Sequence, residues 1–488
     1  MSFVSSQFLL FFPVVTVLYF VIPHRFRWAL LLAASCYFYM AFVPVYLLIL
    51  LFTVSIDYVA AILIERTSDQ QRKKSFLTLS ILANLGVLAF FKYFNFANAN
   101  LASLAGFLHW NYPIGSLSII LPIGLSFHTF QAISYTIEVY RGNQKVERHF
   151  GIYALYVMFY PQLVAGPIER PQNMLRQFRD VHTPDYERIT DGLKQIAWGL
   201  FKKVVIADRL AVLVNEVFSN SYNYNGVVLL AASVSFAFQI FCDFSGYCDI
   251  ALGAAKVMGF KLMTNFDRPY SSASFSEFWR RWHISLSTWF RDYLYIPLGG
   301  SRVLPLRHAT NLMIVFVVSG LWHGANWTFV VWGAIHGLLQ VIEIQVKRLG
   351  QQLPEKIRAI ITDTRVARTV RVILVFAMVD FAWIFFRAND LDQALNFVSG
   401  LVSRFGSGLN TNTLSTISSL LGGRSELIIA FAAIAVMEAV HYTQARTSVS
   451  QLIRRQSLVV RWTLYAILVV SICALGLLGQ QQFIYFQF

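Results

Sequence analysis

The chain has 488 residues, of which 56% are hydrophobic and only 13% are charged. Soluble domains carry about 25% charged residues, so the composition excludes an ordinary soluble protein and predicts an all-α polytopic membrane protein. The formal net charge is +15. In a membrane protein, Lys and Arg that gather in cytoplasmic loops explain such a charge, so we expect no nucleic-acid partner. The four cysteines show no C-x-x-C spacing, which predicts neither a disulfide framework nor a metal site.

Long apolar runs predict the membrane-spanning helices, because about 20 apolar residues cross a bilayer. The first run has no basic segment before it and no A-x-A-like site after it, so we expect a retained helix and not a cleaved signal peptide. The short run 150–166 contains a proline and is expected to be re-entrant or interfacial. The predicted spans lie near residues 7–22, 28–43, 45–64, 76–96, 117–140, 195–214, 226–252, 309–324, 327–346, 369–387, 427–443 and 462–479.

Basic residues sort the loops into two sets that alternate along the chain. Residues 97–116, 215–225 and 480–488 contain no Lys or Arg, whereas the connector 256–308 is rich in them. Because Lys and Arg accumulate on the cytoplasmic side, the alternation predicts cytoplasmic basic loops and an extracytoplasmic N-terminus. The loop 388–426 is rich in Ser, Gly and Asn, so we expect it to be flexible.

The connector 256–308 contains a predicted helix start. Ser274 and Glu277 have the spacing of a capping box, and a mixture of aromatic and basic residues follows. Such a mixture predicts an amphipathic helix in the headgroup region. Within it, Arg280 and Arg281 either hold an anionic group, such as the phosphates of a cofactor or lipid, or anchor the loop at the cytoplasmic surface. His283 is either a functional residue or one that contacts solvent and phosphates.

His323 is a histidine inside a very apolar run. Ionisable residues at membrane depth are costly and usually functional, and the pKa of histidine suits proton transfer near neutral pH. The alternative is a helix-interface histidine whose ring is satisfied by a neighbouring polar group. Gly320 and Gly324 leave room for a backbone or a ligand to approach. Trp322 and Asn326 either orient the ring or a substrate, or pack at a helix end.

Asp243 and Asp249 lie near the end of another apolar run. We expect them to pair with the basic connector or to line a cavity, and paired structural charges are the favoured interpretation, because buried charges need partners. No Walker A, G-x-G-x-x-G, H-E-x-x-H or G-x-S-x-G pattern occurs in a fitting context. Acyl transfer remains as a candidate reaction. In it, a histidine can take the proton of a hydroxyl that attacks a thioester, and no metal or covalent enzyme nucleophile is needed.

Three long strings resemble the bacterial membrane-bound O-acyltransferases (MBOATs), most closely the alginate O-acetyltransferase type. They are residues 277–300 (EFWRRWHISLSTWFRDYLYIPLGG), residues 320–326 (GLWHGAN) and residues 332–337 (WGAIHG). Shorter matching stretches are residues 121–124, 135–142, 165–167 and 243–247. The resemblance covers about residues 1–400 and is weak beyond them.

The resemblance implies a single membrane-embedded domain over 1–488, with a motif-rich core over about 120–400 and further helices within 427–479. The family fold is a ring of about 11–12 tilted helices around a central tunnel, with re-entrant and amphipathic helices. His323 would be the catalytic residue and His283 the second functional position. Donor or substrate contacts are expected from Arg280, Arg281, Trp282, Trp322 and Asn326, while Asp243, Asp249 and His336 are tunnel or structural candidates.

The resemblance also implies the reaction and its setting. The donor would be a cytoplasmic acyl thioester, acetyl-CoA or a carrier-protein thioester, with no bound cofactor and no metal. The acceptor would be an exported cell-surface polysaccharide, reached with a periplasmic SGNH-hydrolase-like partner and a polysaccharide synthesis and export complex. The protein would be a multi-pass protein of the bacterial inner membrane, surrounded by lipid. Two alternatives stay open: acyl transfer to peptidoglycan, teichoic acid or lipid, and a non-enzymatic transporter or channel with His323 as a proton relay.

Overall fold

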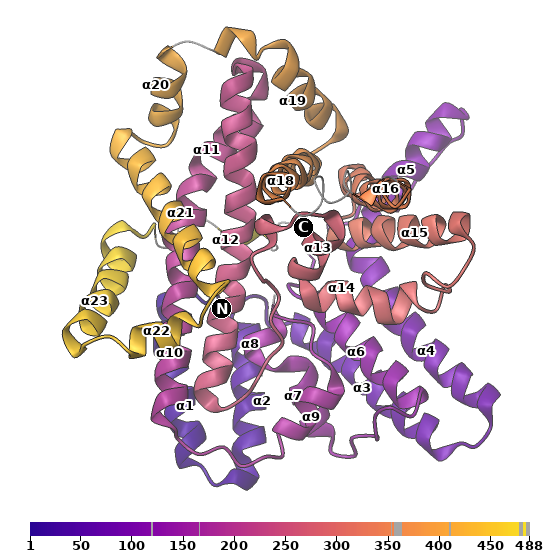
Figure 1. Ribbon diagram of the computed structural model, residues 1–488. Helices are drawn as coiled ribbons and strands as arrows, with labels where there is room; N and C mark the ends of the chain where they lie inside the picture. The colour runs from indigo at the N-terminus through magenta and orange to yellow at the C-terminus, as the bar shows by residue number, and fades with distance from the viewer. Residues whose placement is uncertain are drawn as a thin grey trace. The chain divides into compact units, whose positions relative to one another are not determined.

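The computed structural model describes residues 1–118, 121–164, 166–352, 354–355, 364–408, 411–477 and 482–484, which form helices and connecting segments without a strand. The all-α prediction is therefore confirmed for these residues (Figure 1). Ala165 of the matching stretch 165–167 and most of the basic-poor segment 480–488 lie outside the described residues.

The chain divides into two compact units, and each is assembled from two separate stretches of sequence. Unit 1 comprises Met1–Ile196 and Ile250–Met263, and unit 2 comprises Ala197–Asp249 and Thr264–Phe488. The single domain over 1–488 and the ring around a central tunnel stay predictions. Both histidines singled out by the sequence belong to unit 2.

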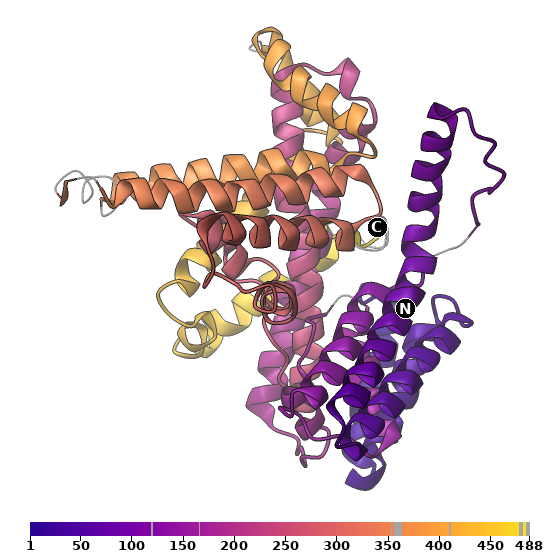
Figure 2. The ribbon, with the colours of Figure 1, turned by 90° about the vertical axis from the view of Figure 1, so that its right-hand side faces the viewer.

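Unit 1 is built from helices that surround a buried polar centre. In it, the carboxylate of Asp57 accepts hydrogen bonds from Ser80 (2.5 Å) and from Asn84 (2.8 Å), so two neighbouring helices share one polar contact. The segment that follows α5 runs back beside it (Figure 2). The helices are α1 (Ser6–Val21), α2 (His24–Met40), α3 (Tyr46–Arg66), α4 (Gln70–Leu88), the π-helix η1 (Ala89–Tyr93), α5 (Phe94–Phe107), α6 (Leu125–Tyr140), α7 (Phe150–Met158), α8 (Tyr160–Leu163), α9 (Pro171–Gln177) and most of α10 (Tyr186–Leu200).

Unit 2 contains most of the long helix α12 and the two helices that carry the Trp-His-Gly region. α15 and α16 run side by side in both ribbon views (Figures 1 and 2). Its elements are the π-helix η2 (Phe201–Ala207), α11 (Asp208–Ser219), η3 (Ser221–Asn223), α12 (Gly226–Met258), η4 (Pro269–Ser271), α13 (Phe275–Arg281), α14 (Ile284–Phe290), the π-helix η5 (Arg291–Tyr295), α15 (Pro305–His323), α16 (Trp327–Gly350), α18 (Arg365–Arg387), α19 (Leu391–Ser403), η6 (Gly406–Gly408), α20 (Thr411–Leu420), α21 (Arg424–Gln444), α22 (Val449–Arg454) and α23 (Leu458–Leu475).

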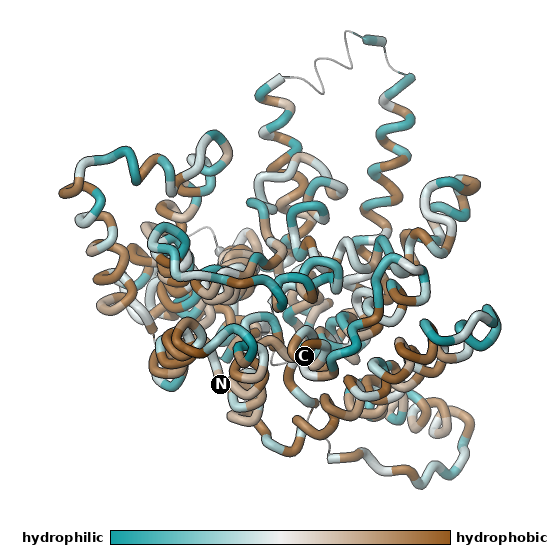
Figure 3. Tube along the Cα trace, turned by 90° about the horizontal axis from the view of Figure 1, so that it is seen from below, coloured by the Kyte–Doolittle hydropathy of each residue, from teal (hydrophilic) through white to brown (hydrophobic). Residues whose placement is uncertain are grey.

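Seven helical segments among the described residues are long and apolar enough to cross a membrane. Hydrophobic residues run along the helices, and hydrophilic residues gather at helix ends and connections (Figure 3). These features make the chain a multi-pass membrane protein. The seven segments are α3, the continuous segment Gln70–Phe107, α12, α16, α18, α21 and α23.

The other five predicted spans also coincide with helices, which are shorter or less apolar. α1 has 16 residues, and the described part of the predicted span 117–140 contains a helix only from Leu125 onward. Gly124 precedes that helix with a φ of 76°, a left-handed conformation that glycine adopts without strain. The helices in the described residues of the run 150–166 are α7 and α8, of nine and four residues, which are too short to span a bilayer.

The predicted flexible loop 388–426 contains two helices, so that expectation is wrong over much of its length. Asp390 caps the first of them, α19, by accepting a hydrogen bond from the Gln393 N–H (2.8 Å). Phe397 of α19 is fully buried and stacks on Phe218 of α11, with ring centroids 4.4 Å apart. The sequence of α19 contains an apolar helix face. It was overlooked because the loop as a whole is rich in Ser and Gly.

Candidate active site

The helix start predicted in the connector is present, but the helix is shorter than expected. Ser274 Oγ accepts a hydrogen bond from the Glu277 N–H (3.1 Å), and the Glu277 carboxylate accepts one from the Ala273 N–H (2.8 Å). This is the capping pattern, except that the acid bonds one residue earlier than in the standard box. α13 ends at Arg281 and α14 begins at Ile284. The single amphipathic helix expected here is therefore two short helices.

His283 forms the break between these helices, in a left-handed backbone conformation with φ 43° and ψ 55°. Such angles are uncommon for a residue other than glycine and persist only where the surroundings enforce them. Asn265 supplies that enforcement. Its carbonyl accepts a hydrogen bond from the Ile284 N–H (3.0 Å), and its side-chain oxygen accepts one from the Ser285 N–H (3.2 Å). Asn265 thus fixes the residues that follow His283, and it was missed by the sequence interpretation.

The ring of His283 is buried, with 1% of the residue exposed. It stands edge-on to the ring of Phe244 on α12, with centroids 4.8 Å apart, and also contacts Trp322 on α15 at 6.2 Å. Burial lowers the pKa of His283 to about 3, because the charged imidazolium would lose its hydration. His283 is therefore a neutral, enclosed imidazole at neutral pH, and not a solvated group at a basic surface.

His323 is the last residue of α15 and is 4% exposed. Three rings stand nearly perpendicular to its imidazole: Trp322 at 4.9 Å, Trp332 at 5.1 Å and Phe386 at 5.4 Å. They come from α15, α16 and α18, so the position of the imidazole depends on three helices. The surroundings are apolar, as the sequence predicted.

Two tryptophans connect the three histidines of the motif strings. Trp322 contacts both His283 and His323, and Trp332 contacts both His323 and His336, the latter at 5.0 Å. His336 has no measurable exposure and lies among rings, as expected for a packing histidine. We call His323, His336, Trp322, Trp332 and Phe386 the aromatic histidine cluster.

Small residues allow the helices of this cluster to lie close together. A methyl group at Gly320 would collide with the carbonyl of Phe329, and one at Gly333 would collide with the carbonyl of Phe316. A methyl group at Gly324 would collide with the ring of Phe329. The room that these glycines leave is taken by the neighbouring helix, which brings the rings of α16 against His323.

Asn326 has a structural role at the start of α16. Its side-chain oxygen accepts a hydrogen bond from the Thr328 N–H (3.0 Å), and its amide donates to the carbonyl of Asn389 (2.7 Å). The first contact caps α16, and the second ties the turn between α15 and α16 to the end of α18. Between the two interpretations left open by the sequence, these contacts support packing at a helix end.

The connector residues next to His283 have different surroundings from one another. Arg280 is exposed. Arg281 forms an ion pair with Glu277 (2.7 Å) and donates to Ser271 (2.8 Å). Trp282 is 1% exposed and packs on Trp383 with centroids 5.0 Å apart. Trp282 is thus a core residue, whereas the two arginines remain candidates for binding an anionic group.

Comparison with known proteins identifies the family. The model of the membrane-bound O-acyltransferase family (MBOAT) matches residues 149–361. A probable alginate O-acetylase AlgI of Azotobacter vinelandii is 38% identical over 448 residues, which cover 89% of this chain and 84% of the relative. The chain belongs to the membrane-bound O-acyltransferase family. It is therefore an acyltransferase.

Relatives that are named for other acceptors are also similar to this acyltransferase. A peptidoglycan O-acetyltransferase of Helicobacter pylori is 36% identical over 414 residues, covering 80% of this chain and 75% of the relative. A teichoic acid D-alanyltransferase of Streptococcus thermophilus is 31% identical over 241 residues, covering 47% of this chain and 58% of the relative. The similarity thus extends to proteins named for different acceptors.

The acyltransferase also contains buried ion pairs in unit 2, which we call the lysine–aspartate cluster. Lys203 Nζ lies 2.6 Å from Asp243 and 2.7 Å from Asp208, while Lys202 Nζ lies 2.6 Å from Asp249. Asp243 and Asp249, the two aspartates singled out in the sequence, are thus paired structural charges. The lysines that pair with them belong to η2 and not to the connector 256–308. The available signal was a Lys-Lys pair inside the apolar run 195–214.

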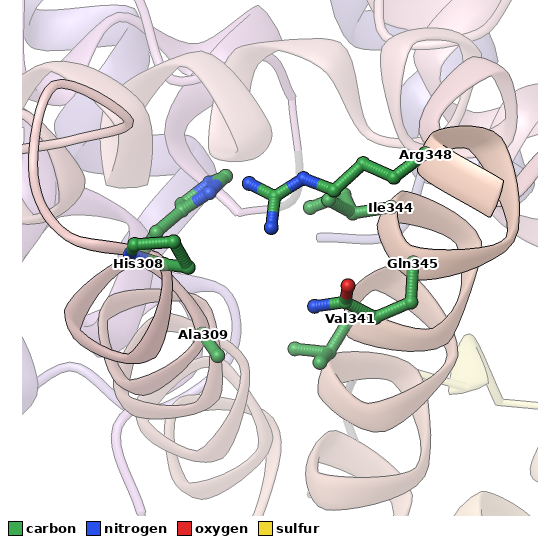
Figure 4. Close-up of a pocket in the computed structure, with 7 residues that line it drawn as sticks. His308, Ala309, Val341, Ile344, Gln345 and Arg348 are labelled. Carbon is green, nitrogen blue, oxygen red and sulfur yellow. The ribbon is translucent and has the colours of Figure 1, made fainter. Parts of the chain in front are cut away.

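A small hollow lies between α15 and α16, far from His323. His308 and Ala309 of α15 face α16 there, and the guanidinium of Arg348 points into the hollow (Figure 4). His308 and His323 are 15 residues apart on one helix, a separation of about 22 Å at 1.5 Å per residue. The hollow is thus separate from the aromatic histidine cluster; its lining is Pro305, His308, Ala309, Val341, Ile344, Gln345 and Arg348.

Proposed function

We propose that this membrane-bound O-acyltransferase transfers an acetyl group from a cytoplasmic thioester, with His323 as the general base, for O-acetylation of an exported cell-surface polysaccharide. The observation that carries the proposal is the enclosure of His323 in neutral rings at the end of α15. An imidazole enclosed by apolar rings is more stable in its neutral form, which is the form that accepts a proton.

The reaction needs one proton to move. His323 takes the proton from the acceptor hydroxyl as the hydroxyl oxygen attacks the thioester carbonyl. The new C–O bond forms and the C–S bond breaks. The sulfur leaves as a thiolate and is protonated to a thiol, and His323 returns to its neutral form. A positioned general base typically contributes about 10²–10⁴-fold to a rate.

The donor in this proposal is acetyl-CoA, with a carrier-protein thioester as the alternative. Arg280 is exposed next to His283, and arginine holds phosphate groups well. Arg281 is part of an ion pair with Glu277, so it would need to be shared or released. A periplasmic SGNH-hydrolase-like partner would carry the acetyl group onward to the polysaccharide.

The test is acetyl transfer from labelled acetyl-CoA by the full chain in membranes, with its partner present. His323→Ala should reduce transfer by about 10²-fold or more. His308→Ala is the matched control, because it removes a histidine from the same helix that lines the hollow and bonds Tyr295 (2.8 Å), outside the aromatic histidine cluster. Normal transfer by a folded His323→Ala variant would contradict the general-base role.

The acceptor is tested separately. The relatives bear alginate, peptidoglycan and teichoic acid names, and alginate O-acetylases match the largest share of this chain. We therefore expect a deletion strain to lose acetyl groups from an exported polysaccharide while the acylation of its peptidoglycan and teichoic acid is unchanged. Mass analysis of the purified envelope glycans distinguishes these outcomes, and a loss confined to peptidoglycan would contradict the polysaccharide acceptor.

A further inference from the structure

A short segment beyond α23, residues 482–484, packs against α12 next to the candidate site. Phe483 and Ile484 are only 4% and 3% exposed. The Ile484 N–H donates a hydrogen bond to the Asp243 carboxylate (2.7 Å), although the two residues are 241 positions apart in the sequence. The segment is thus held by a buried backbone contact as well as by its side chains.

The ring of Phe483 contacts two aromatic residues of α12. It stacks on Tyr247, with centroids 4.5 Å apart and planes 25° apart, and lies 6.0 Å from Phe244. Tyr247 follows Asp243 by four positions and Phe244 by three. Residues at these spacings are neighbours on the surface of a helix, so the three side chains lie on one side of α12. The segment therefore covers the matching stretch 243–247 through its side chains and its backbone.

Phe244 also links residues 482–484 to His283, because its ring contacts both Phe483 and His283. Phe244 stands edge-on to the imidazole, with centroids 4.8 Å apart. Asp243, which receives the Ile484 N–H, is at the same time held by Lys203 at 2.6 Å. The orientation of Phe244, and with it one wall around His283, thus depends on groups that residues 482–484 hold.

We propose that Phe483 is a positioning residue for His283, acting through Phe244. The proposal rests on the proposed function and on the role of second functional position that the family resemblance implies for His283. Phe483 limits the rotation of Phe244 and so keeps the imidazole of His283 in one orientation. A small displacement of a group in an active site is enough to lower a rate strongly.

The first experiment measures the contact without using catalysis. Diethylpyrocarbonate, which modifies accessible neutral imidazoles, is applied to the full chain in membranes, and each histidine is followed by mass spectrometry. Phe483→Ala should speed the modification of His283 several-fold, while that of His336 stays unchanged as an internal control. Trp462→Ala is the matched control, since that ring lies on α23 and is 65% exposed. Unchanged modification of His283 in Phe483→Ala would overturn the proposal.

The second experiment measures catalysis with acetyl-CoA. Phe483→Ala should lower kcat several-fold with little change in the KM for acetyl-CoA, and Phe483→Tyr, which keeps the ring, should restore it. An unchanged kcat would overturn the positioning role, and a raised kcat would show that the segment obstructs the site instead. If transfer persists in both His323→Ala and His283→Ala, the proposed function fails, whereas the modification rates still decide whether Phe483 holds the ring.

Discussion

The aromatic histidine cluster and the lysine–aspartate cluster bury polar side chains in the same unit in opposite ways. His323 and His336 are enclosed by rings of Trp and Phe. Lys202 and Lys203 are instead neutralised by aspartates at 2.6–2.7 Å. An imidazole can be buried in its neutral form, whereas lysine and aspartate remain ions that need each other. The first cluster holds imidazoles among aromatic rings, and the second joins helices through ion pairs.

The largest expected effect is on the lysine–aspartate cluster. Lys203→Met should destabilise the protein by about 3–5 kcal/mol, because it leaves Asp208 and Asp243 buried without their cation. Thermal unfolding in detergent checks this. Lys347→Met is the control, since its ion pair with Glu343 is more exposed and such pairs contribute about 0–1 kcal/mol. Equal losses in the two variants would contradict the contrast between the clusters.

An intermediate effect is expected at Asn265, which joins neither cluster but fixes the backbone next to His283. Asn265→Ala removes the side-chain acceptor of the Ser285 N–H and should cost about 1–3 kcal/mol, the typical penalty for a buried donor without a partner. Denaturant unfolding measures the loss. A loss well below about 1 kcal/mol would show that the hydrogen bond to Ser285 is not what stabilises this turn.

The smallest effect is expected in the aromatic histidine cluster. His336→Leu replaces a fully buried ring by an apolar side chain of similar size and should change the free energy of unfolding by less than about 1.5 kcal/mol. The same unfolding measurement applies. A loss as large as that of Lys203→Met would mean that His336 carries a polar interaction, and the comparison between the two clusters would no longer hold.

The sequence predicted the helical class and most helix positions, because long apolar runs and a capping pattern are local signals. It could not predict the break at His283. That break depends on Asn265, whose hydrogen bonds to Ile284 and Ser285 bridge about 20 positions of sequence. The helix α19 was missed for a related reason, since its apolar face is stabilised by Phe218 on a distant helix.

For the candidate site, the motif strings identified His283, His323 and His336, and the structure brings all three to neighbouring rings. The rings themselves could not be predicted. Phe244 and Phe386 look like ordinary apolar residues in the sequence, and their contacts with the histidines arise only when α12 and α18 pack. The same holds for the partners of Asp243 and Asp249, because which lysines face an aspartate depends on helix rotation.

The backbone angles of His283 also affect how its chemistry can be examined by mutagenesis. In a left-handed conformation, the Cβ atom of an ordinary residue costs roughly 1–2 kcal/mol, and asparagine and glycine are tolerated best. Substitution by alanine therefore removes the imidazole but retains the strain, while glycine removes both. Asparagine removes the imidazole at a position where its own backbone preference fits. A comparison of asparagine, alanine and glycine at 283 would separate the contribution of the ring from that of the turn.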